Sequence, residues 1–300
     1  MINWICTIFL GTLGWGVSLF LIKILLKSLT PTEIVLYRMI IGSFILFILI
    51  KILDFKISQK KYLLRDGFVL ALFNIVIPFY LTTYAEKSVT SSLASVVNGL
   101  TPIFTFMLGI IFIPSQRQIN WINFLSVLMG FTGIIIMNFS DPYHSDNLIY
   151  FIALIVASFS YAIAANYVKT FAKIKNPILL STAAAFFSVV LMLLYKLMTV
   201  ERFNWHLPQN SQEIMALLWL GSVGSGISLY LYCLLIQRNG AVNASMVTYL
   251  MLVTGVLAGT LFLNEPLSAM VIFGCICTVF SIILINHSSW LTRKFSQLYK

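Results

Sequence analysis

Charged residues are scarce in this chain, and their scarcity argues against an ordinary soluble protein. Only 9% of the 300 residues are Asp, Glu, Lys or Arg, and 60% are hydrophobic. A typical soluble domain has about 25% charged residues. A soluble fold of this size needs a polar exterior, which so few polar side chains cannot supply. The chain is therefore predicted to lie in a membrane.

Cysteine and histidine are also rare. The four cysteines, Cys6, Cys233, Cys275 and Cys277, fall within apolar runs, so the loops show no sign of a disulfide framework or a zinc site. The three histidines lie in loops or at the end of an apolar run. No Ser/His/Asp, Cys/His or metal-ligand pattern is present, and we predict no catalytic residues, no metal and no cofactor.

Long apolar runs take the place of charge. The sequence predicts ten runs that can each cross a hydrocarbon layer roughly 30 Å thick. They are 4–26, 31–50, 66–85, 89–113, 119–139, 147–168, 177–198, 213–236, 240–263 and 267–287. The first run has no basic start and leads directly into another, so we interpret it as an uncleaved span. The predicted fold is an all-α polytopic membrane protein with ten transmembrane helices and no room for a soluble domain.

The basic residues are distributed unevenly between the two sides of the predicted membrane. If both termini are cytoplasmic, the inward loops and the basic tail 288–300 hold thirteen Lys and Arg, and the outward loops hold three. This is the positive-inside bias of membrane insertion. It accounts for the formal charge of +10 without a nucleic-acid partner, and it predicts that both termini are cytoplasmic.

The two halves of the chain match each other at a nearly constant offset. Lys23 and Pro31 align with Lys169 and Pro177 at a shift of 146, and 91–112 aligns with 241–262 at a shift of 150. The shared order predicts two five-helix repeats, over 1–139 and 147–287. Because each repeat has an odd number of spans, the second copy is inverted relative to the first. Inverted repeats are a known basis of alternating access, with the substrate site near the membrane midplane.

Small and polar residues form a stripe along the fourth predicted span. They are Ser91, Ser95, Asn98, Pro102, Thr105 and Gly109, and their counterparts in the ninth span are Ala241, Ser245, Thr248, Leu252, Gly255 and Gly259. One interpretation is close helix packing, with hydroxyls bonded across the helix pair. Asn98 and Pro102, however, lie near mid-depth, where an unpaired amide is costly and proline frees a carbonyl one turn earlier. We expect the stripe to line a cavity between the halves and to pack at its ends.

Other spans carry further polar and aromatic candidates at similar depth. Trp15 lies far from the interfaces where tryptophan is usually found, although aromatic residues more often fill a core than stack on a ligand. The predicted substrate-binding set is Trp15, Arg38, Asn74, Tyr80, Ser95, Asn98, Pro102, Ser225, Tyr230, Thr248 and Tyr249. It would suit a ligand with a flat or apolar part and a polar head.

Arg38 is the one charge well inside a predicted span. Burying an arginine at mid-helix costs about 2.5–3.5 kcal/mol on insertion scales, so it needs a partner or a task. Two interpretations stay open: the side chain reaches toward the outer surface and pairs with Glu33, or it contacts an anionic group of the substrate.

Carboxylates are absent from the predicted mid-membrane positions, where a proton relay would need one. Glu33 and Glu86 lie at outer span ends, which are poor positions for a group that alternates access. Arg38 stays protonated, and the tyrosines titrate near pH 10. The sequence therefore favours facilitated diffusion or exchange without proton coupling.

The residues described so far resemble the EamA-type branch of the drug/metabolite transporter superfamily. The resemblance covers essentially the whole chain, and it is carried by GWG at 14–16, YR at 37–38, SLASVVNGLTPIFTFMLG at 92–109 and SMVTYLMLVTGVLAGTLFLNEPL at 245–267. It implies a permease of the inner (plasma) membrane, often an exporter of amino acids, other metabolites or drugs. The family's Glu after the ninth span matches Glu265. The chain departs from the family pattern at Ser115 and Leu252, which makes the two halves unequal.

The leading hypothesis is an alternating-access transporter, exporter or exchanger, for a small metabolite such as an amino acid or a related amphipathic compound. The alternative from another class is a non-transporting membrane receptor or assembly protein that reuses the fold. An integral membrane enzyme is disfavoured because no catalytic set lies near a membrane surface. The expected partners are the lipid bilayer and the small-molecule substrate, and a homodimer stays open.

Overall fold

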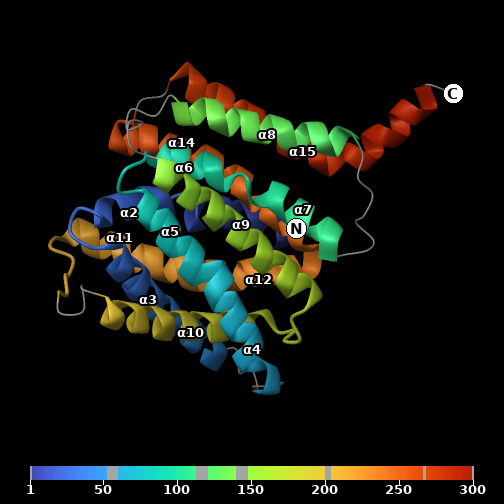
Figure 1. Ribbon diagram of the computed structural model, residues 1–300. Coiled ribbons are helices and arrows are strands. Elements are labelled where there is room, and N and C mark those ends of the chain that lie inside the picture. Colours follow the sequence, from blue (N-terminus) through green and yellow to red (C-terminus); the bar gives the residue numbers. More distant parts are fainter. Residues whose placement is uncertain are drawn as a thin grey trace.

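The computed structural model describes residues 2–52, 60–112, 121–139, 148–199, 204–265 and 268–298, and every regular element in these ranges is a helix (Figure 1). Eight helical stretches are long and apolar enough to cross a membrane: Ile5–Leu25, Pro31–Ile52, Lys61–Ala85, Ser91–Phe112, Leu148–Thr170, Pro177–Met198, Ser211–Asn239 and Ala241–Leu263. They match eight of the ten predicted spans. Helices also occupy the other two, and that these cross the membrane as well stays a prediction.

Several predicted spans are built from two consecutive helices. The first half contains α1 (Ile2–Phe9), α2 (Ser18–Leu25), α3 (Pro31–Ile52), α4 (Lys60–Leu70), α5 (Ile77–Ala85), α6 (Ser91–Asn98), α7 (Thr101–Phe112) and α8 (Trp121–Phe139). The second half contains α9 (Leu148–Thr170), α10 (Pro177–Met198), α11 (Ser211–Gly221), α12 (Ser228–Asn239), α13 (Ala241–Ser245), α14 (Val247–Leu263) and α15 (Ala269–Leu298). The last helix continues well past residue 287, where the predicted span ends.

Wider helical turns interrupt three of the spans. π-helical turns lie at Leu10–Gly14, Ala71–Val76 and Ser222–Ile227, and such turns are frequent at functional sites. In the fourth span a new helix begins at Thr101, so Pro102 lies in a first helical turn. A first turn does not need the N–H that proline lacks. Pro102 therefore starts a helix instead of breaking one at mid-depth.

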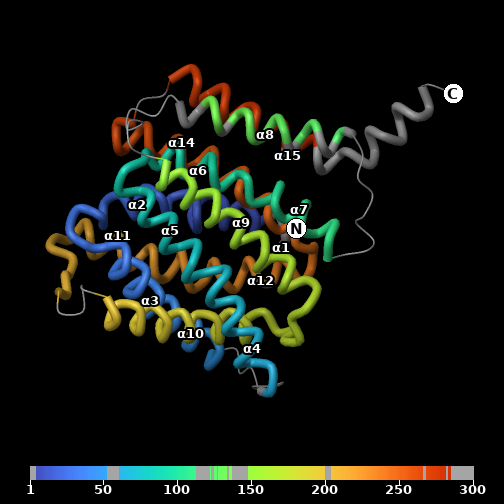
Figure 2. The backbone as a smooth tube through the Cα atoms, in the orientation of Figure 1, coloured from blue at the N-terminus to red at the C-terminus, as the bar shows by residue number. Residues whose placement is uncertain are grey.

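Helices from the two halves alternate within one bundle. α3 packs along α10, α6 along α14, α7 along α9, and α2 along α11. Figure 2 shows that α3 and α10, far apart in the sequence, lie side by side. α8 and α15 form a further pair along one side of the bundle (Figure 1). A site at the centre of this bundle is therefore bounded by both halves.

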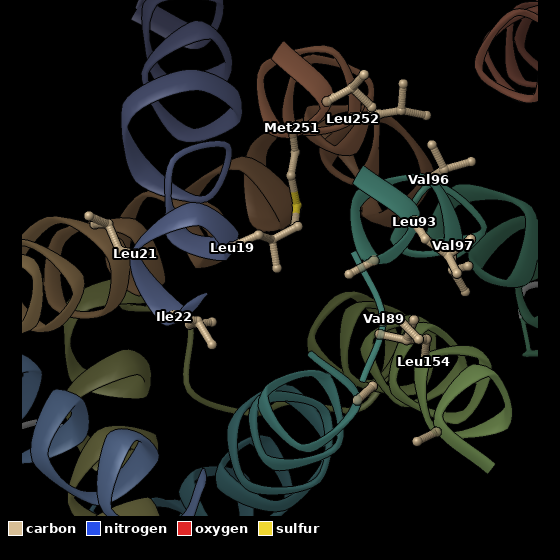
Figure 3. Close-up of a cluster of buried hydrophobic side chains, with 14 of the residues drawn as sticks. Leu19, Leu21, Ile22, Val89, Leu93, Val96, Val97, Leu154, Met251 and Leu252 are labelled. Carbon is tan, nitrogen blue, oxygen red and sulfur yellow. The ribbon is translucent and has the colours of Figure 1, made fainter. Parts of the chain in front are cut away.

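Buried aliphatic side chains fill the space between these helices. One cluster joins Leu19 of α2, Leu93 of α6, Leu154 of α9 and Met251 of α14, all less than a tenth exposed. Figure 3 shows Leu19 and Met251 pointing toward each other across the two halves. The four cysteines are free: Cys6 and Cys233 are buried, and Cys275 and Cys277 are partly exposed.

Buried carboxylates hold the two ends of the bundle together. At the end where α3 begins, Glu33 accepts a hydrogen bond at 2.9 Å from Lys196 Nζ and another at 2.8 Å from the backbone of His206. At the opposite end, where α4 begins, Asp66 accepts bonds from Tyr167 and the backbone of Ile174. We call these the Glu33 end and the Asp66 end. The interpretation that Glu33 pairs with Arg38 is wrong, because Lys196 takes that place.

Candidate functional site

A cavity lies at the centre of the bundle, between the two halves. It is lined by Trp15, Ser18, Leu19, Ile22, Arg38, Phe79, Thr82, Asn98, Thr101, Tyr161, Tyr232, Thr248 and Met251. Its volume is about 40 Å³. One water needs roughly 10–15 Å³, so in this conformation the cavity has room for a few waters but not for a metabolite. A metabolite would enter only after the helices or their side chains move.

Arg38 supplies the positive charge of the cavity. Its side chain is 3% exposed, and its guanidinium lies 4.0 Å from the centre of the Phe79 ring. Nε donates to Ser225 Oγ at 2.8 Å, and Nη2 has one long contact of 3.5 Å with the carbonyl of Gly224. A guanidinium has five N–H donors, so at least three have no protein acceptor among the described residues. No described carboxylate lies within ion-pair distance of Arg38.

The local backbone explains why Arg38 points inward. Gly42, one helical turn further along α3, lies against Gly221 and Gly226 of the eighth span, and a Cβ there would come within 3.1 Å of their backbone atoms. This close approach brings α3 against the π-helical turn that contains Ser225. Ser225 Oγ donates to Leu220 O at 2.9 Å, so its lone pairs remain available to Arg38.

Aromatic rings and unpaired polar groups form the rest of the wall. Trp15 and Tyr232 meet edge to face with ring centres 4.8 Å apart, and the rings of Tyr161 and Phe79, which also line the cavity, are 6.3 Å apart. The hydroxyls of Thr82 and Thr101 are buried and have no hydrogen-bond partner in the described part of the chain. Buried polar groups normally have a partner. Their presence around the guanidinium is typical of a site that completes its hydrogen bonds with a ligand or water.

The structure brings four of the predicted site residues to the cavity wall: Trp15, Arg38, Asn98 and Thr248. Ser225 lies directly behind Arg38. The other six do not line this cavity: Asn74, Tyr80, Ser95, Pro102, Tyr230 and Tyr249. That any of the eleven binds substrate stays a prediction.

Residues of the stripe and of its counterpart in the ninth span differ in what they contact. Asn98 and Thr248 face the cavity, whereas Ser95 is fully buried and sits where a Cβ on Gly255 would be. Tyr80 is displaced further, because its hydroxyl lies 3.1 Å from that of Tyr195 in an apolar groove between α5 and α10. Asn74 is buried in a π-helical turn, and neither amide atom has a hydrogen-bond partner among the described residues.

Sequence reasoning missed several residues of the wall, chiefly Phe79, Thr82, Thr101, Tyr161 and Tyr232. Thr101 and Thr82 are ordinary residues of apolar spans, and nothing in their spacing sets them apart. Tyr161 and Tyr232 had a usable signal, since a phenol in mid-span needs a polar environment for its hydroxyl. In the eighth span the neighbouring Tyr230 was chosen instead, because the helix phase was not known.

We expect the division of the stripe to be visible in cysteine reactivity. In a background with the four native cysteines replaced by alanine, cysteines at positions 98 and 248 should react with a small aqueous thiol reagent. A cysteine at position 95 should react no faster than one at the fully buried Val96, because Gly255 covers it. The measurement is the rate of labelling in membranes. Equal rates at positions 95 and 98 would contradict the packing described here.

The bundle and its central cavity define the class of protein to which this chain belongs. The arrangement is that of a polytopic helical membrane protein with a cavity between two halves. The chain belongs to the EamA-like transporter family, whose model matches it twice, over residues 2–139 and 148–287.

The similar curated proteins are all named as transporters. An uncharacterized transporter of Archaeoglobus fulgidus is 26% identical over 87% of this chain and 90% of its own length. The uncharacterized inner membrane transporter YedA of Escherichia coli K12 is 25% identical, covering 92% and 88%. The uncharacterized transporter YoaV of Bacillus subtilis is 22% identical, covering 90% and 92%. A crystal structure that is 17% identical superposes with a TM-score of 0.65 over 96% of both chains, which supports the fold.

Proposed function

We propose that this protein is an alternating-access transporter of the inner membrane, an exporter or exchanger that carries a small metabolite with an anionic group, such as an amino acid. The observation that carries the proposal is Arg38: a buried guanidinium with unpaired donors, facing a central cavity. An anionic group could accept from those donors, and charge-assisted bonds of this kind are the strong ones. The rings of Trp15, Tyr161 and Tyr232 would then cover the apolar part of the same ligand.

Helix boundaries support the two inverted five-helix repeats on which alternating access depends. α3 and α10 each have 22 residues and begin with a proline, 146 residues apart. The π-helical turns at Ala71–Val76 and Ser222–Ile227 have equal lengths and lie 151 residues apart. α6 and α13 begin 150 residues apart. These separations are close to the predicted offset of 146 to 150, so the π-helical turns of the third and eighth spans correspond to each other. The turn at Leu10–Gly14 has no such counterpart, because α9 is one unbroken α-helix.

The end contacts follow the same pattern. Asp66, at the start of the third span, binds the backbone of Lys173 and Ile174 between the sixth and seventh spans. Glu213, at the start of the eighth span, binds Ser28 between the first and second spans at 2.6 Å. Exchanging the two halves exchanges these two contacts. They lie at opposite ends of the bundle, as an axis in the membrane plane would require.

The halves differ at the charged position. Arg38 corresponds at the offset of 146 to Ala184, a buried residue of α10. Ser225, which accepts from Arg38, corresponds at the offset of 151 to Asn74, whose amide has no partner among the described residues. The cavity therefore has a single cationic position, and a ligand with one anionic group suits it best.

We propose that the Asp66 end and both termini face the cytoplasm, on the basis of the thirteen-to-three distribution of Lys and Arg. Reporter fusions after Lys61, Lys173 and Lys294 should then read cytoplasmic, and fusions within 199–212 should read external. A fusion at Lys294 that reads external would contradict this topology.

Ligand binding tests the function directly. The protein in detergent should be stabilised against heat by amino acids of the right size, since a ligand that binds only the folded state raises its stability. The matching amino alcohols, which lack the carboxylate, should not stabilise it. The best amino acid should then enter proteoliposomes faster when they contain the same compound unlabelled. Binding without any uptake would favour the receptor alternative, and equal stabilisation by acids and alcohols would remove the role of Arg38.

A further inference from the structure

Glu86 is a buried carboxyl group without a hydrogen-bond partner. It directly follows α5 at the Glu33 end, its side chain is 1% exposed, and neither carboxylate oxygen has a partner among the described residues. An isolated ionised carboxylate costs many kcal/mol to bury, and such a group usually takes up a proton instead. The sequence predicts that Glu86 lies at a span end, where a carboxylate is expected to be hydrated. The tertiary structure shows that it is buried instead.

The other described carboxylates are all well satisfied, which makes Glu86 the exception among them. Glu33 binds Lys196 and His206, Asp66 binds Tyr167 and two backbone N–H groups, and Glu213 binds Ser28 and two neighbours. Glu265 accepts four bonds of 2.6–3.0 Å from the backbone and hydroxyls of Ser91 and Ser92. Donors from the protein already occupy the oxygens of these four groups, whereas neither oxygen of Glu86 has one.

The helical turn that ends at Glu86 connects it to the central cavity. Thr82 and Thr83 belong to that turn, and their hydroxyls are also buried without partners in the described part of the chain. Four of the eleven such atoms therefore lie on one turn of one helix. Thr82 lines the cavity and precedes Glu86 by four residues, a spacing that places the two on one helix face. Glu86 thus lies one turn from the wall that contains Arg38.

Three charged groups interact electrostatically with Glu86. Lys23 comes from α2, Arg38 from α3, and Glu265 from the segment after α14; none forms an ion pair with it. α9, which packs along α5, carries the phenols Tyr150 and Tyr161. Burial raises the pKa of Glu86 well above its ordinary value; Lys23 and Arg38 oppose this rise, and Glu265 adds to it.

We propose that Glu86 is a proton-binding site of the transport cycle, coupled through Arg38 to the anionic group of the cargo. The proton comes from water at the open side and forms an O–H bond on the Glu86 carboxylate. It returns to water, leaving the carboxylate, when the cavity opens to the other side. A metal cation fits less well, because hard cations take about six or more oxygen ligands. One carboxylate and two hydroxyls on a single turn cannot supply them beside two positive side chains.

The coupling follows from the electrostatic attraction between Arg38 and the ionised form of Glu86. When the cavity is empty, the positive charge of Arg38 favours the ionised form of Glu86. An anionic cargo group on Arg38 cancels that charge and favours the protonated form. By linkage, protonation of Glu86 must strengthen binding of the anion by the same factor. Cargo anion and proton then cross together, so the proton gradient biases the direction of net transport, a coupling that the sequence did not predict. This inference rests on the proposed transport of an anionic cargo.

Infrared titration of the purified wild-type protein, without any cargo, tests the proton site. A protonated carboxyl has a C=O stretching band that a carboxylate lacks, and we expect such a band at neutral pH that is lost in Glu86→Gln. In Arg38→Gln the midpoint of this band should move to higher pH, because a positive charge that favours the carboxylate has been removed. A band that persists in Glu86→Gln would overturn the proposal. A band abolished by adding NaCl at constant pH would assign the site to Na⁺ instead.

Thermal stability gives a second readout that does not depend on transport. Because the folded pKa of Glu86 is raised, its contribution to stability is fully present below the ordinary carboxyl pKa and is lost as pH rises through the folded value. The melting temperature of the wild type should therefore fall relative to that of Glu86→Gln as pH rises. Parallel melting curves at all pH values would overturn the proposal. Neither measurement uses cargo, so a failed uptake assay and a failed proton site remain distinguishable.

Discussion

Replacing Arg38 with glutamine should reduce binding of the carboxylate ligand roughly a hundredfold. Hydrogen bonds to a charged group contribute about 1.5–3 kcal/mol, and glutamine provides neither the charge nor the fork of donors. The fold should survive, because Ser225 keeps its bond to Leu220 O when Arg38 is lost. Arg38→Lys keeps the charge but not the planar contact with Phe79. We therefore expect its affinity for the ligand to lie between those of the wild type and Arg38→Gln.

The matched control is Arg238→Gln, the same chemical change at an exposed position at the end of α12. Binding should be measured as the ligand concentration that half-saturates thermal stabilisation, for an amino acid and for its amino alcohol. The wild type and Arg238→Gln should prefer the acid, and Arg38→Gln should lose that preference. If Arg38→Gln still discriminates between acid and alcohol, the arginine has a structural role and the substrate proposal fails.

Lys196→Met should destabilise the protein by about 3–5 kcal/mol. Lys196 and Glu33 are both fully buried and lie 2.9 Å apart, and removing one partner of such a pair leaves an uncompensated charge. Glu33 would retain the backbone N–H of His206 and the groups of Thr30, which compensate the charge only in part. The free energy of unfolding, measured by titration with a denaturing detergent, is the quantity to compare.

The double variant Glu33→Gln/Lys196→Met distinguishes the effect of an unpaired buried charge from the effect of lost packing. Because it removes both charges, it should recover much of the lost stability. Lys173→Met serves as the control, because that side chain is exposed and only its backbone binds Asp66. If the double variant is no more stable than Lys196→Met alone, the loss comes from packing and not from a buried unpaired charge.

The apolar runs in the sequence were enough to predict the eight long membrane helices. Each apolar run longer than the hydrocarbon thickness must form a helix, because only a helix satisfies its own backbone hydrogen bonds in lipid. Pro31 and Pro177 begin α3 and α10 as the repeat predicted. The length of an apolar run and the position of a proline act within one segment of the chain. Their effects can therefore be predicted without knowing which helices pack against that segment.

The membership of the cavity was only partly predictable. A span of known length still leaves the rotation of its helix open, and rotation decides which side chains face inward. Arg38 and Asn98 were found because a charge or an amide at mid-depth needs a polar neighbour wherever the helix faces. The Ser95 hydroxyl donates to Ser91 O of its own helix at 2.9 Å. It therefore has a hydrogen-bond partner without facing a polar cavity.

The sequence by itself determined the helical membrane class and eight of the spans, and it predicted the duplication, because these depend on residue type and spacing along the chain. Tertiary structure alone decided that Glu33 binds Lys196, 163 residues away, that Tyr161 and Tyr232 join Trp15 around Arg38, and that Glu86 is enclosed without a partner. Each of these facts depends on how two distant helices are rotated and placed against each other. That arrangement is set by the combined packing of many side chains, such as Gly42 against Gly221 and Ser95 against Gly255, and no single segment contains it.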